Sequence, residues 1–462
     1  MRSLICNAFT AYSRHFQKRI IITRCFSNMD DLMNDVDGMI NDLVSGQSKE
    51  KDTLGWRKDF GDLDTLIIRE TKPSPVEVKT IQGRRVFIKR DDLLRLPGSQ
   101  ISGNKARKML AINEIPVQDF PDCLVSYGGP QSNSMLALAA LVNYKDREAS
   151  EFALSNTESS QDEQNEDQDP MPEKRWKRFV YYTKKLPRFL RNQPSGNLFR
   201  AKTLGMELVE LSNDDYDALF GGDSGGSTVP PMDPPIHGDS LWVPQGGAFG
   251  MAQVGARVLA DEIVSFWLES GEGRPLSICL PGGTCSTAVL LHHEIKKLVC
   301  DSTEPLDIEV VVIPCVGDAS YARRQMSALS VETGQPAEDI PSILLPAPDT
   351  QLGQSGRKTP RYFTFGKPNK SILDVFKVMR DDYGVVLDLL YGAPAWTILL
   401  RHWNTPISPD LIFDLNNPIA GREILYVHSG GLEGINSQLL RYKYNGLVSI
   451  QDIQLPGRKK KK

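Results

Sequence analysis

The feature that most constrains this chain is a recurring order of apolar run, glycine turn and helical pattern. Seven apolar runs are strand candidates, at 86–90, 123–129, 179–183, 240–247, 276–283, 308–314 and 423–431. Helical patterns follow some of these runs, at 132–143, 250–270 and 286–299. Strands that alternate with helices in this way build parallel sheets flanked by helices. We therefore expect an α/β fold, in which a ligand binds at the carboxyl ends of the strands, where the glycine turns lie.

The composition of the 462-residue chain is that of a globular protein and excludes several function classes. Hydrophobic residues make up 40% and charged residues 24%, and the net charge is -4. A chain so close to neutral has no overall positive field for a phosphate backbone, so we expect no nucleic-acid partner. The 7 cysteines are scattered and form no CxxC pair, which argues against a disulfide framework or a metal site. No apolar run approaches the roughly 18 residues that span a bilayer, so no membrane partner is expected.

The two ends of the chain differ from its body. Residues 1–28 are basic and hydroxylated and contain no acidic residue, which is the pattern of a mitochondrial or plastid transit peptide. A mitochondrial location is therefore expected; the alternative is a disordered tail on a cytoplasmic protein. Residues 29–55 are expected to form a linker or surface helix, 56–455 the compact region and 456–462 a basic tail.

Two segments inside the body have the composition of insertions. Residues 155–173 are acidic and polar, so they cannot bury enough apolar area to offset the entropy of ordering them. Residues 221–239 are rich in glycine and proline and predict a long loop. Basic residues interleaved with aromatic ones at 174–191 suit either an RNA-binding strip or a solvated face beside one buried strand.

Three glycine turns between strand and helix candidates are possible anion sites. They are GGPQSN (128–133), QGGAFG (245–250) and PGGTCST (281–287). Glycine permits close backbone approach, and a helix N-terminus offers unpaired N–H groups. None matches the dinucleotide fingerprint or the P-loop. The turn at 281–287 is the best phosphate cradle, because Gly282, Gly283 and Thr284 supply backbone amides.

A lysine at the start of a helical pattern is the sharpest chemical signal. Lys105 follows Ser-Gly-Asn (102–104), and such a turn can hold a lysine in a partly buried pocket. A lysine held in this way can form a Schiff base with a carbonyl cofactor. The alternative is that Lys105, Arg107 and Lys108 are solvated charges at the start of a helix.

Other residues with reactive side chains fit no known catalytic spacing. The pair His292 and His293 lacks the HExxH arrangement and is expected to lie on a helix surface. Cys285 stands at a helix N-terminus, which can lower a thiol pKa, but we expect a small residue of the phosphate turn rather than a nucleophile. His428 follows an apolar run and is expected to be a hydrogen-bonded histidine at the end of a strand.

Taken in order, a series of motifs resembles the D-cysteine desulfhydrase and 1-aminocyclopropane-1-carboxylate (ACC) deaminase family. The motifs are Lys-Arg-Asp-Asp (89–92), Gly-Asn-Lys-Ala-Arg-Lys (103–108), Ser-Tyr-Gly-Gly-Pro-Gln-Ser-Asn (126–133), Ser-Gly-Asn-Leu (195–198), Val-Pro-Gln-Gly-Gly-Ala (243–248), Pro-Gly-Gly-Thr (281–284), Leu-Asp-Leu-Leu-Tyr-Gly (387–392) and Val-His-Ser-Gly-Gly (427–431). The resemblance covers about residues 60–445. It implies pyridoxal 5'-phosphate (PLP) as cofactor and a two-lobed tryptophan-synthase-β-like fold whose smaller lobe spans about 107–240. A small amino acid as substrate and a homodimer are implied as well.

The resemblance also implies roles for individual residues. Lys105 matches the lysine that binds PLP and, once freed, removes the substrate's α-proton. Ser132 and Tyr391 match residues beside the substrate. The residues that match cofactor contacts are Lys105, Asn133 at the 3'-oxygen, Gly282, Gly283 and Thr284 at the phosphate, and Ser429 near the pyridine ring.

Two positions depart from the family pattern. Gly392 follows the tyrosine where the deaminases carry a glutamate that pairs with the pyridine nitrogen, and Ser102 replaces a usual glycine. Without that carboxylate the electron sink is weaker. The resemblance therefore implies a lyase that converts D-cysteine to pyruvate, sulfide and ammonia. ACC deaminase-like activity and a non-catalytic, PLP-binding regulatory role are the alternatives.

Overall fold

The computed structural model describes residues 72–158, 176–192, 194–220, 239–346, 363–404 and 417–449. All of these residues belong to a compact unit that spans Asp59–Lys462. The expected transit peptide, the linker, the basic tail and most of both expected insertions lie outside the described residues. Within the described part of the chain, none of the helices combines the length and the apolar character that a membrane-crossing segment requires.

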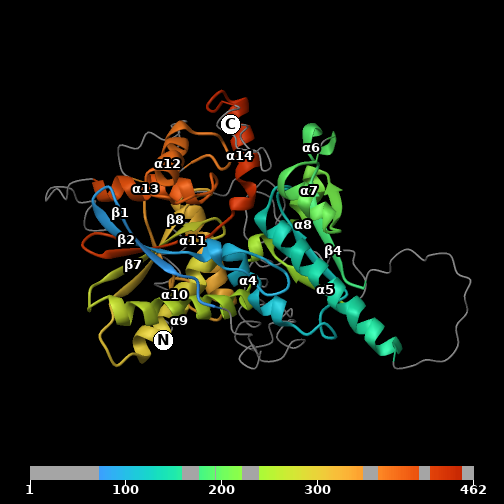
Figure 1. The fold of residues 1–462 in the computed structure, drawn as a ribbon, viewed down its shortest axis with the longest axis horizontal. Helices are drawn as coiled ribbons and strands as arrows, with labels where there is room; N and C mark the ends of the chain where they lie inside the picture. The colour runs from blue at the N-terminus through green and yellow to red at the C-terminus, as the bar shows by residue number, and fades with distance from the viewer. Residues whose placement is uncertain are drawn as a thin grey trace, which may run out of the picture. The chain divides into compact units, whose positions relative to one another are not determined.

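A six-stranded sheet forms the larger half of the fold (Figure 1). Its strands lie in the order β1 (Val76–Ile81), β2 (Arg84–Lys89), β10 (Glu423–Val427), β7 (Leu276–Gly282), β8 (Ile308–Pro314) and β9 (Ser342–Ile343). The pair β1 and β2 is an antiparallel hairpin, whereas all other neighbours pair in parallel. Parallel strands point their carboxyl ends to one edge, which is where the loops of interest emerge.

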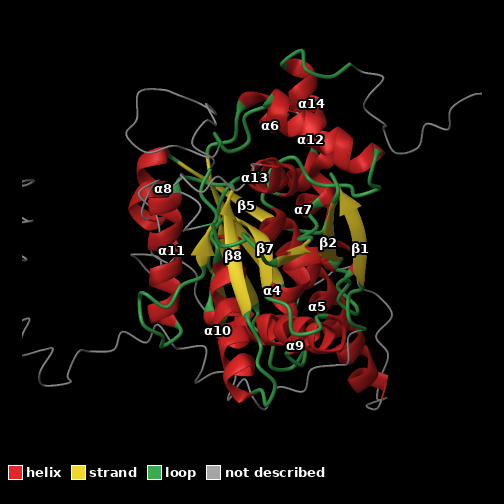
Figure 2. Cartoon of the chain, turned by 90° about the vertical axis from the view of Figure 1, so that its left-hand side faces the viewer, coloured by secondary structure: helices red, strands yellow, loops and turns green. Residues whose placement is uncertain are grey.

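Helices cover both faces of this sheet, because its strands are apolar on both sides. Alternate residues of β2 divide between the faces: Val86 and Ile88 join the core that contains Trp396, whereas Phe87 meets Trp267 edge-to-face at 5.4 Å. In Figure 2 the strands lie in the centre, with helices above and below them. The helices above are α12 (Lys370–Asp381) and α13 (Gly392–Asn404), those below are α9 (Gln253–Ser270) and α10 (Ser286–Asp301), and α11 (Ala319–Glu332) packs beside α10.

A second sheet of four parallel strands forms the smaller half. Its order is β5 (Glu207–Leu211), β4 (Arg178–Lys184), β3 (Cys123–Tyr127) and β6 (Ser240–Val243). The helices around this sheet are α5 (Asn133–Glu158), α6 (Arg188–Asn192), α7 (Gly196–Thr203) and α8 (Asn213–Phe220). Aromatic packing fastens α8 to one face, since Tyr127 stacks on Phe220 with ring centroids 4.1 Å apart.

The remaining elements are short or connect the two sheets. They are α4 (Gly103–Glu114), α14 (Ile435–Tyr444) and the 3-10 turns η2 (Asp91–Leu93), η3 (Gln245–Gly247), η4 (Gly250–Ala252) and η6 (Leu432–Gly434). Helix α4 approaches α9 so closely that a β-carbon on Gly255 would lie 1.9 Å from the carbonyl oxygen of Arg107. This contact requires glycine at position 255.

The α/β class, with parallel sheets flanked by helices, is confirmed. All seven strand candidates contain a strand, although those expected to reach 247 and 431 end earlier, at Val243 and Val427. Three strands, β1, β5 and β9, are not among the strand candidates of the sequence. Helix α5 continues to Glu158, so its last residues overlap the start of the expected acidic insertion at 155.

Candidate active site

Loops at the carboxyl ends of the strands meet at one place between the two sheets. The loop after β6 touches the loop after β7: a β-carbon on Gly246 would lie 3.1 Å from Cγ2 of Thr284. The loop after β10 touches the start of α5, where a β-carbon on Gly431 would lie 3.0 Å from Nδ2 of Asn133. Segments far apart in the sequence therefore form one glycine-lined site.

The start of α4 is fixed against the loop after β10, and this contact positions Lys105. Gly103 has φ of 65°, and a β-carbon there would lie 2.5 Å from the carbonyl oxygen of Ser429. The N–H of Asn104 donates to that same oxygen at 2.9 Å. Only glycine combines this left-handed conformation with so close an approach at low cost. Lys105 follows two residues later, in the first turn of α4, and reaches into the site.

Two lysine amines converge on a single carbonyl group. Nζ of Lys105 donates to the carbonyl oxygen of Gly246 at 2.9 Å, and Nζ of Lys108 donates to the same oxygen at 3.0 Å. Burial lowers the pKa of Lys105 to about 8 and lowers that of Lys108 well below its usual value, with the charge of Lys105 adding to the second effect. Neither amine forms an ion pair with a carboxylate in the described part of the chain. The site thus holds two buried amines that have no carboxylate partner among the described residues.

The turn after β7 has the features of an anion cradle. Nζ of Lys108 donates to Oγ of Ser286 at 2.5 Å, and that hydroxyl lies 3.1 Å from Oγ1 of Thr284. A β-carbon on Gly283 would lie 3.0 Å from Cε1 of Tyr391, so the backbone of this turn has to be bare. Helix α10 begins at Ser286, and its first N–H groups point into the turn without helical partners. Backbone donors, hydroxyls and an amine are therefore gathered in one turn.

Lys108 was missed as a site residue and is not a solvated charge. Its side chain is buried, as is that of Arg107, so the solvated reading of these positions is wrong. One sequence signal was present: residues three apart lie on the same face of a helix, so Lys108 follows Lys105 into the site.

The tyrosine of the sequence analysis lies over the cradle. Tyr391 is held by Asp388, whose Oδ1 accepts its N–H at 2.8 Å, and burial raises the pKa of Tyr391 above its usual value. Oδ2 of Asp388 accepts the N–H of Gly392 at 2.8 Å, and a β-carbon on Gly392 would lie only 3.1 Å from that oxygen. A larger residue at 392 would press against the carboxylate that starts α13.

The loop after β3 brings Ser132 and Asn133 to the opposite side of the site. Oγ of Ser132 accepts the N–H groups of Ser134 and Met135, at 3.1 and 3.3 Å, and so caps α5. The buried Tyr181 donates to the carbonyl oxygen of Gly129 at 3.2 Å and supports the loop from β4.

His428 and Ser102, which lie near Ser429, both form hydrogen bonds within the protein. His428 is buried; its Nε2 donates to the carbonyl oxygen of Val386 at 2.7 Å and its Nδ1 accepts the N–H of Gly430 at 3.3 Å. It is therefore a hydrogen-bonded histidine at the end of a strand, as expected. Ser102 donates its hydroxyl to Oε1 of Glu433 at 2.6 Å, away from Lys105.

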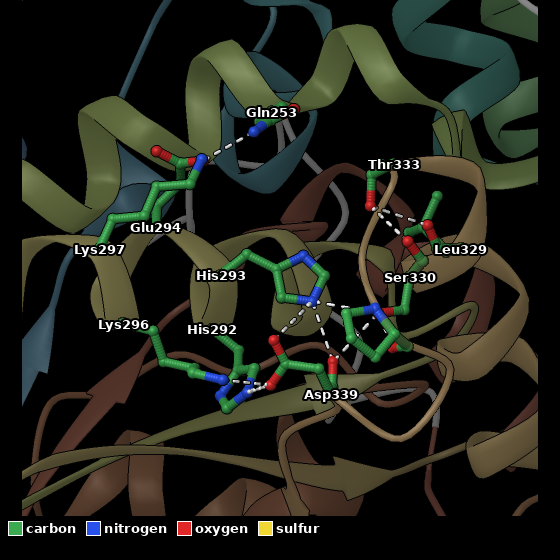
Figure 3. A network of polar contacts seen from close by, with 11 residues as sticks. Gln253, His292, His293, Glu294, Lys296, Lys297, Leu329, Ser330, Thr333 and Asp339 are labelled. Carbon is green, nitrogen blue, oxygen red and sulfur yellow. Dashed lines mark hydrogen bonds and ion pairs between the residues drawn. The ribbon is translucent and has the colours of Figure 1, made fainter. Parts of the chain in front are cut away.

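The remaining candidates have structural roles. Burial raises the pKa of the Cys285 thiol to about 12, which suits a small residue of the turn and not a nucleophile. The expected surface pair is half wrong, because His293 is buried and its Nε2 lies 2.9 Å from the carbonyl oxygen of Asp339 (Figure 3). His292 pairs with Oδ1 of the same aspartate at 3.1 Å. Among the described residues, no group of three or more His, Cys, Asp or Glu side chains could hold a metal ion.

Basic residues around β4 pair with acidic neighbours. Nη2 of Arg178 lies 2.7 Å from Oε2 of Glu207, and Nζ of Lys177 lies 3.1 Å from Oδ1 of Asp122. Arg191 pairs with a glutamate in the same way. The basic residues around β4 therefore form a solvated face on which positive charges are paired with negative ones, beside one buried strand.

A scan of known protein families finds no match to this chain. Its fold is similar to those of three solved structures. The first is an ACC deaminase homologue, with 18% identity, a TM-score of 0.49 and coverage of 83% of this chain and 95% of that one. The second is an L-serine ammonia-lyase from Rhizomucor miehei, with 12% identity, a TM-score of 0.46 and coverage of 81% of this chain and 98% of that one. The third is a threonine deaminase from T.th., with 12% identity, a TM-score of 0.43 and coverage of 81% of this chain and 97% of that one.

Proposed function

We propose that this protein is a PLP-dependent lyase that acts on a small amino acid. The observation that carries the proposal is the pair of buried amines, Lys105 and Lys108, which share the carbonyl of Gly246 and lack a carboxylate partner among the described residues. One amine needs a counter-charge and the other is well suited to bond a carbonyl carbon. A phosphate ester that carries an aldehyde satisfies both.

The residues of the site fit PLP. The bare turn of Gly282, Gly283 and Thr284 offers backbone donors to the phosphate, and Lys108 and Ser286 add charged and hydroxyl donors beside it. When bound, PLP supplies an aldehyde for the amine and a conjugated ring that takes up electrons from the substrate.

The protein's own side chains would hold and move protons. Because its pKa is lowered to about 8, Lys105 has an appreciable neutral fraction near neutral pH and can accept a proton at Nζ. Tyr391, with its raised pKa, keeps its phenolic proton and can donate it from the side of the phosphate turn. The hydroxyl of Ser132 accepts two backbone N–H groups and also has the side chain of Tyr181 as a hydrogen-bond partner, which together hold it at this side of the site.

Within this class, we propose D-cysteine as the substrate, with pyruvate, sulfide and ammonia as products. The support is Gly392, which places no carboxylate at the position where the resemblance leads one to expect a partner for the pyridine nitrogen. A thiolate leaves readily and demands less of the electron sink than a ring carbon does. ACC deaminase-like activity is the alternative within the same site.

A visible absorption spectrum of the purified full chain tests the proposal. We expect a visible band from PLP bound to Lys105, which changes when the right amino acid is added from a panel of D- and L-amino acids. Borohydride reduction and peptide mapping should place a phosphopyridoxyl group on Lys105, and a label on another lysine would contradict the assignment. A band that no amino acid perturbs would favour a non-catalytic PLP-binding role.

A further inference from the structure

We infer that Asn197 is a positioning residue that fixes the side-chain amide of Asn133, so that Asn133 can present only an N–H donor to the 3'-oxygen of PLP. The inference rests on the proposed function, since it concerns how that site holds its cofactor. Asn197 lies on α7 and is 2% exposed, whereas Asn133 opens α5.

A backbone carbonyl determines which way the Asn197 amide points. Nδ2 of Asn197 lies 3.2 Å from the carbonyl oxygen of Gln131 and 2.8 Å from Oδ1 of Asn133. A carbonyl oxygen can only accept, so the group that faces it has to be the NH2 of Asn197. The same NH2 reaches Asn133, and Asn133 therefore has to turn its oxygen toward Asn197.

A second pair of backbone groups holds this arrangement in place. The N–H of Asn197 donates to Oε1 of Gln131 at 2.9 Å, and Nε2 of Gln131 donates to the carbonyl oxygen of Ser195 at 2.9 Å. A β-carbon on Gly196 would lie 2.6 Å from Oε1 of Gln131, so the glycine of Ser-Gly-Asn makes room for the contact. The side-chain amides of Gln131 and Asn197 are thus oriented by main-chain N–H and carbonyl groups, and a main-chain group is always either a donor or an acceptor.

The NH2 group of Asn133 is left for a ligand. It forms no hydrogen bond within the described part of the chain, and it lies against Gly431, where a β-carbon would approach it to 3.0 Å. An N–H donor at this place stabilises a negatively charged oxygen of a ligand. If the amide of Asn133 were flipped, its carbonyl oxygen would face that ligand oxygen and repel it. The orientation of Asn133 therefore decides whether it attracts or repels the 3'-oxygen.

The test uses the full chain and the substitution Asn197→Asp. The new carboxylate has no N–H to offer, so it favours the flipped amide of Asn133. We expect the dissociation constant for PLP to rise about tenfold or more, because a charge-assisted hydrogen bond is lost. The pH at which the visible band of bound PLP titrates should shift by about one unit. A dissociation constant and a band equal to those of the wild type would overturn the inference.

A double-mutant cycle distinguishes an effect of Asn197 on the orientation of Asn133 from a general structural effect and from an effect of the added negative charge. In an Asn133→Ala background, Asn197→Asp should change neither PLP affinity nor the titration of the band, because its target is gone. Equal effects in both backgrounds would overturn the inference. Should Asn197→Asp fail to fold, Asn197→Ala takes its place, with a smaller loss that is again absent from the Asn133→Ala background. A wild-type chain without a visible band would instead refute the proposed function, and the inference with it.

Discussion

At the scale of single residues, the chemistry of the site depends on the protonation of Lys105. Burial penalises the charged amine and lowers its pKa from 10.5 to about 8. Because only the neutral amine bonds a carbonyl, the pH dependence of PLP capture reports this environment.

We predict that the apo chain captures PLP with a rate that rises about tenfold per pH unit below about pH 8 and levels off above it. An exposed lysine would instead continue to accelerate toward pH 10.5. Stopped-flow measurement of the visible band over this pH range checks the prediction. The Lys105→Ala variant is the control and should show no such phase.

Gly392 is the residue that separates the two candidate activities. Its N–H donates to Asp388, and a side chain there would crowd that carboxylate, so a glutamate at this position would require Asp388 to shift. If the pyridine nitrogen lacks a charged partner, a hydrogen bond of roughly 1.5–3 kcal/mol is lost from transition states that need a strong electron sink.

We predict that kcat/KM for D-cysteine exceeds that for ACC by about ten- to a hundredfold. Thiolate departure needs little help from the ring, whereas opening of the cyclopropane leaves carbanion character that the ring has to absorb. Steady-state kinetics with the two substrates decide the matter. An equal or reversed preference would show that another group supports the pyridine nitrogen.

At the scale of elements, the sequence predicts the central strands but only one of the four edge strands, β6. β1, β5 and β9 are edge strands of their sheets. Such strands face solvent on one side, so β1 carries polar residues between its apolar ones and β9 is only two residues long. They lack the continuous apolar run by which β7 or β8, buried on both faces, is recognised.

The sequence predicts the individual turns of the site better than the contacts between them. Each glycine turn is visible because glycine is needed where backbones approach closely. The contact of Lys105 with Gly246, or of Gly431 with Asn133, depends instead on strand order, which spacing along the chain does not reveal. The resemblance to a known family supplied that placement for Lys105 and Asn133 but not for Lys108 or Asn197.

A buried ion network anchors α4, the helix that carries Lys105. Arg107 contacts Asp91 at 2.8 Å and Glu262 at 2.7 Å, and Lys89 contacts Glu262 at 2.5 Å. All four side chains are nearly inaccessible to solvent, so removal of one charge leaves the others uncompensated.

We predict that Arg107→Met lowers the free energy of unfolding by about 3–5 kcal/mol, because Asp91 loses its main partner while it stays buried. The matched control is Arg178→Met, which breaks an ion pair of similar length with Glu207 on the surface and should cost under about 1 kcal/mol. Denaturant titration of both variants makes the comparison. Equal losses would mean that the network does not anchor α4.

At the scale of the whole molecule, the site joins two separate sheets. Lys105 and the cradle belong to the larger sheet and its helices, whereas Asn133 and Ser132 follow β3 of the smaller one. The acidic segment lies far from this junction along the chain, between the end of α5 at Glu158 and the start of β4 at Arg178.

We predict that deletion of residues 159–173 leaves PLP binding unchanged, because their composition supplies no core residues and α5 and β4 keep their own packing. Equilibrium titration of the deletion variant with PLP provides the measurement. A loss of binding would require this segment to support the site.

The stability of the apo protein should reveal the cost of leaving an amine buried without a counter-charge. The unfolded chain keeps Lys105 protonated up to about pH 10.5, whereas the folded chain releases that proton near pH 8, so folding is penalised below pH 8 and the penalty fades as the pH rises toward 10.5. We predict that Lys105→Met makes the apo chain more stable by about 1–3 kcal/mol at pH 7 and that this gain shrinks with rising pH. The matched control is Lys145→Met, since the buried amine of Lys145 has Glu148 at 2.9 Å and the carbonyl of Ile115 at 2.8 Å, and its removal should destabilise. Denaturation of both variants between pH 7 and pH 10 provides the test, and a loss of stability for Lys105→Met at pH 7 would show that the apo site compensates its amine by a contact of its own.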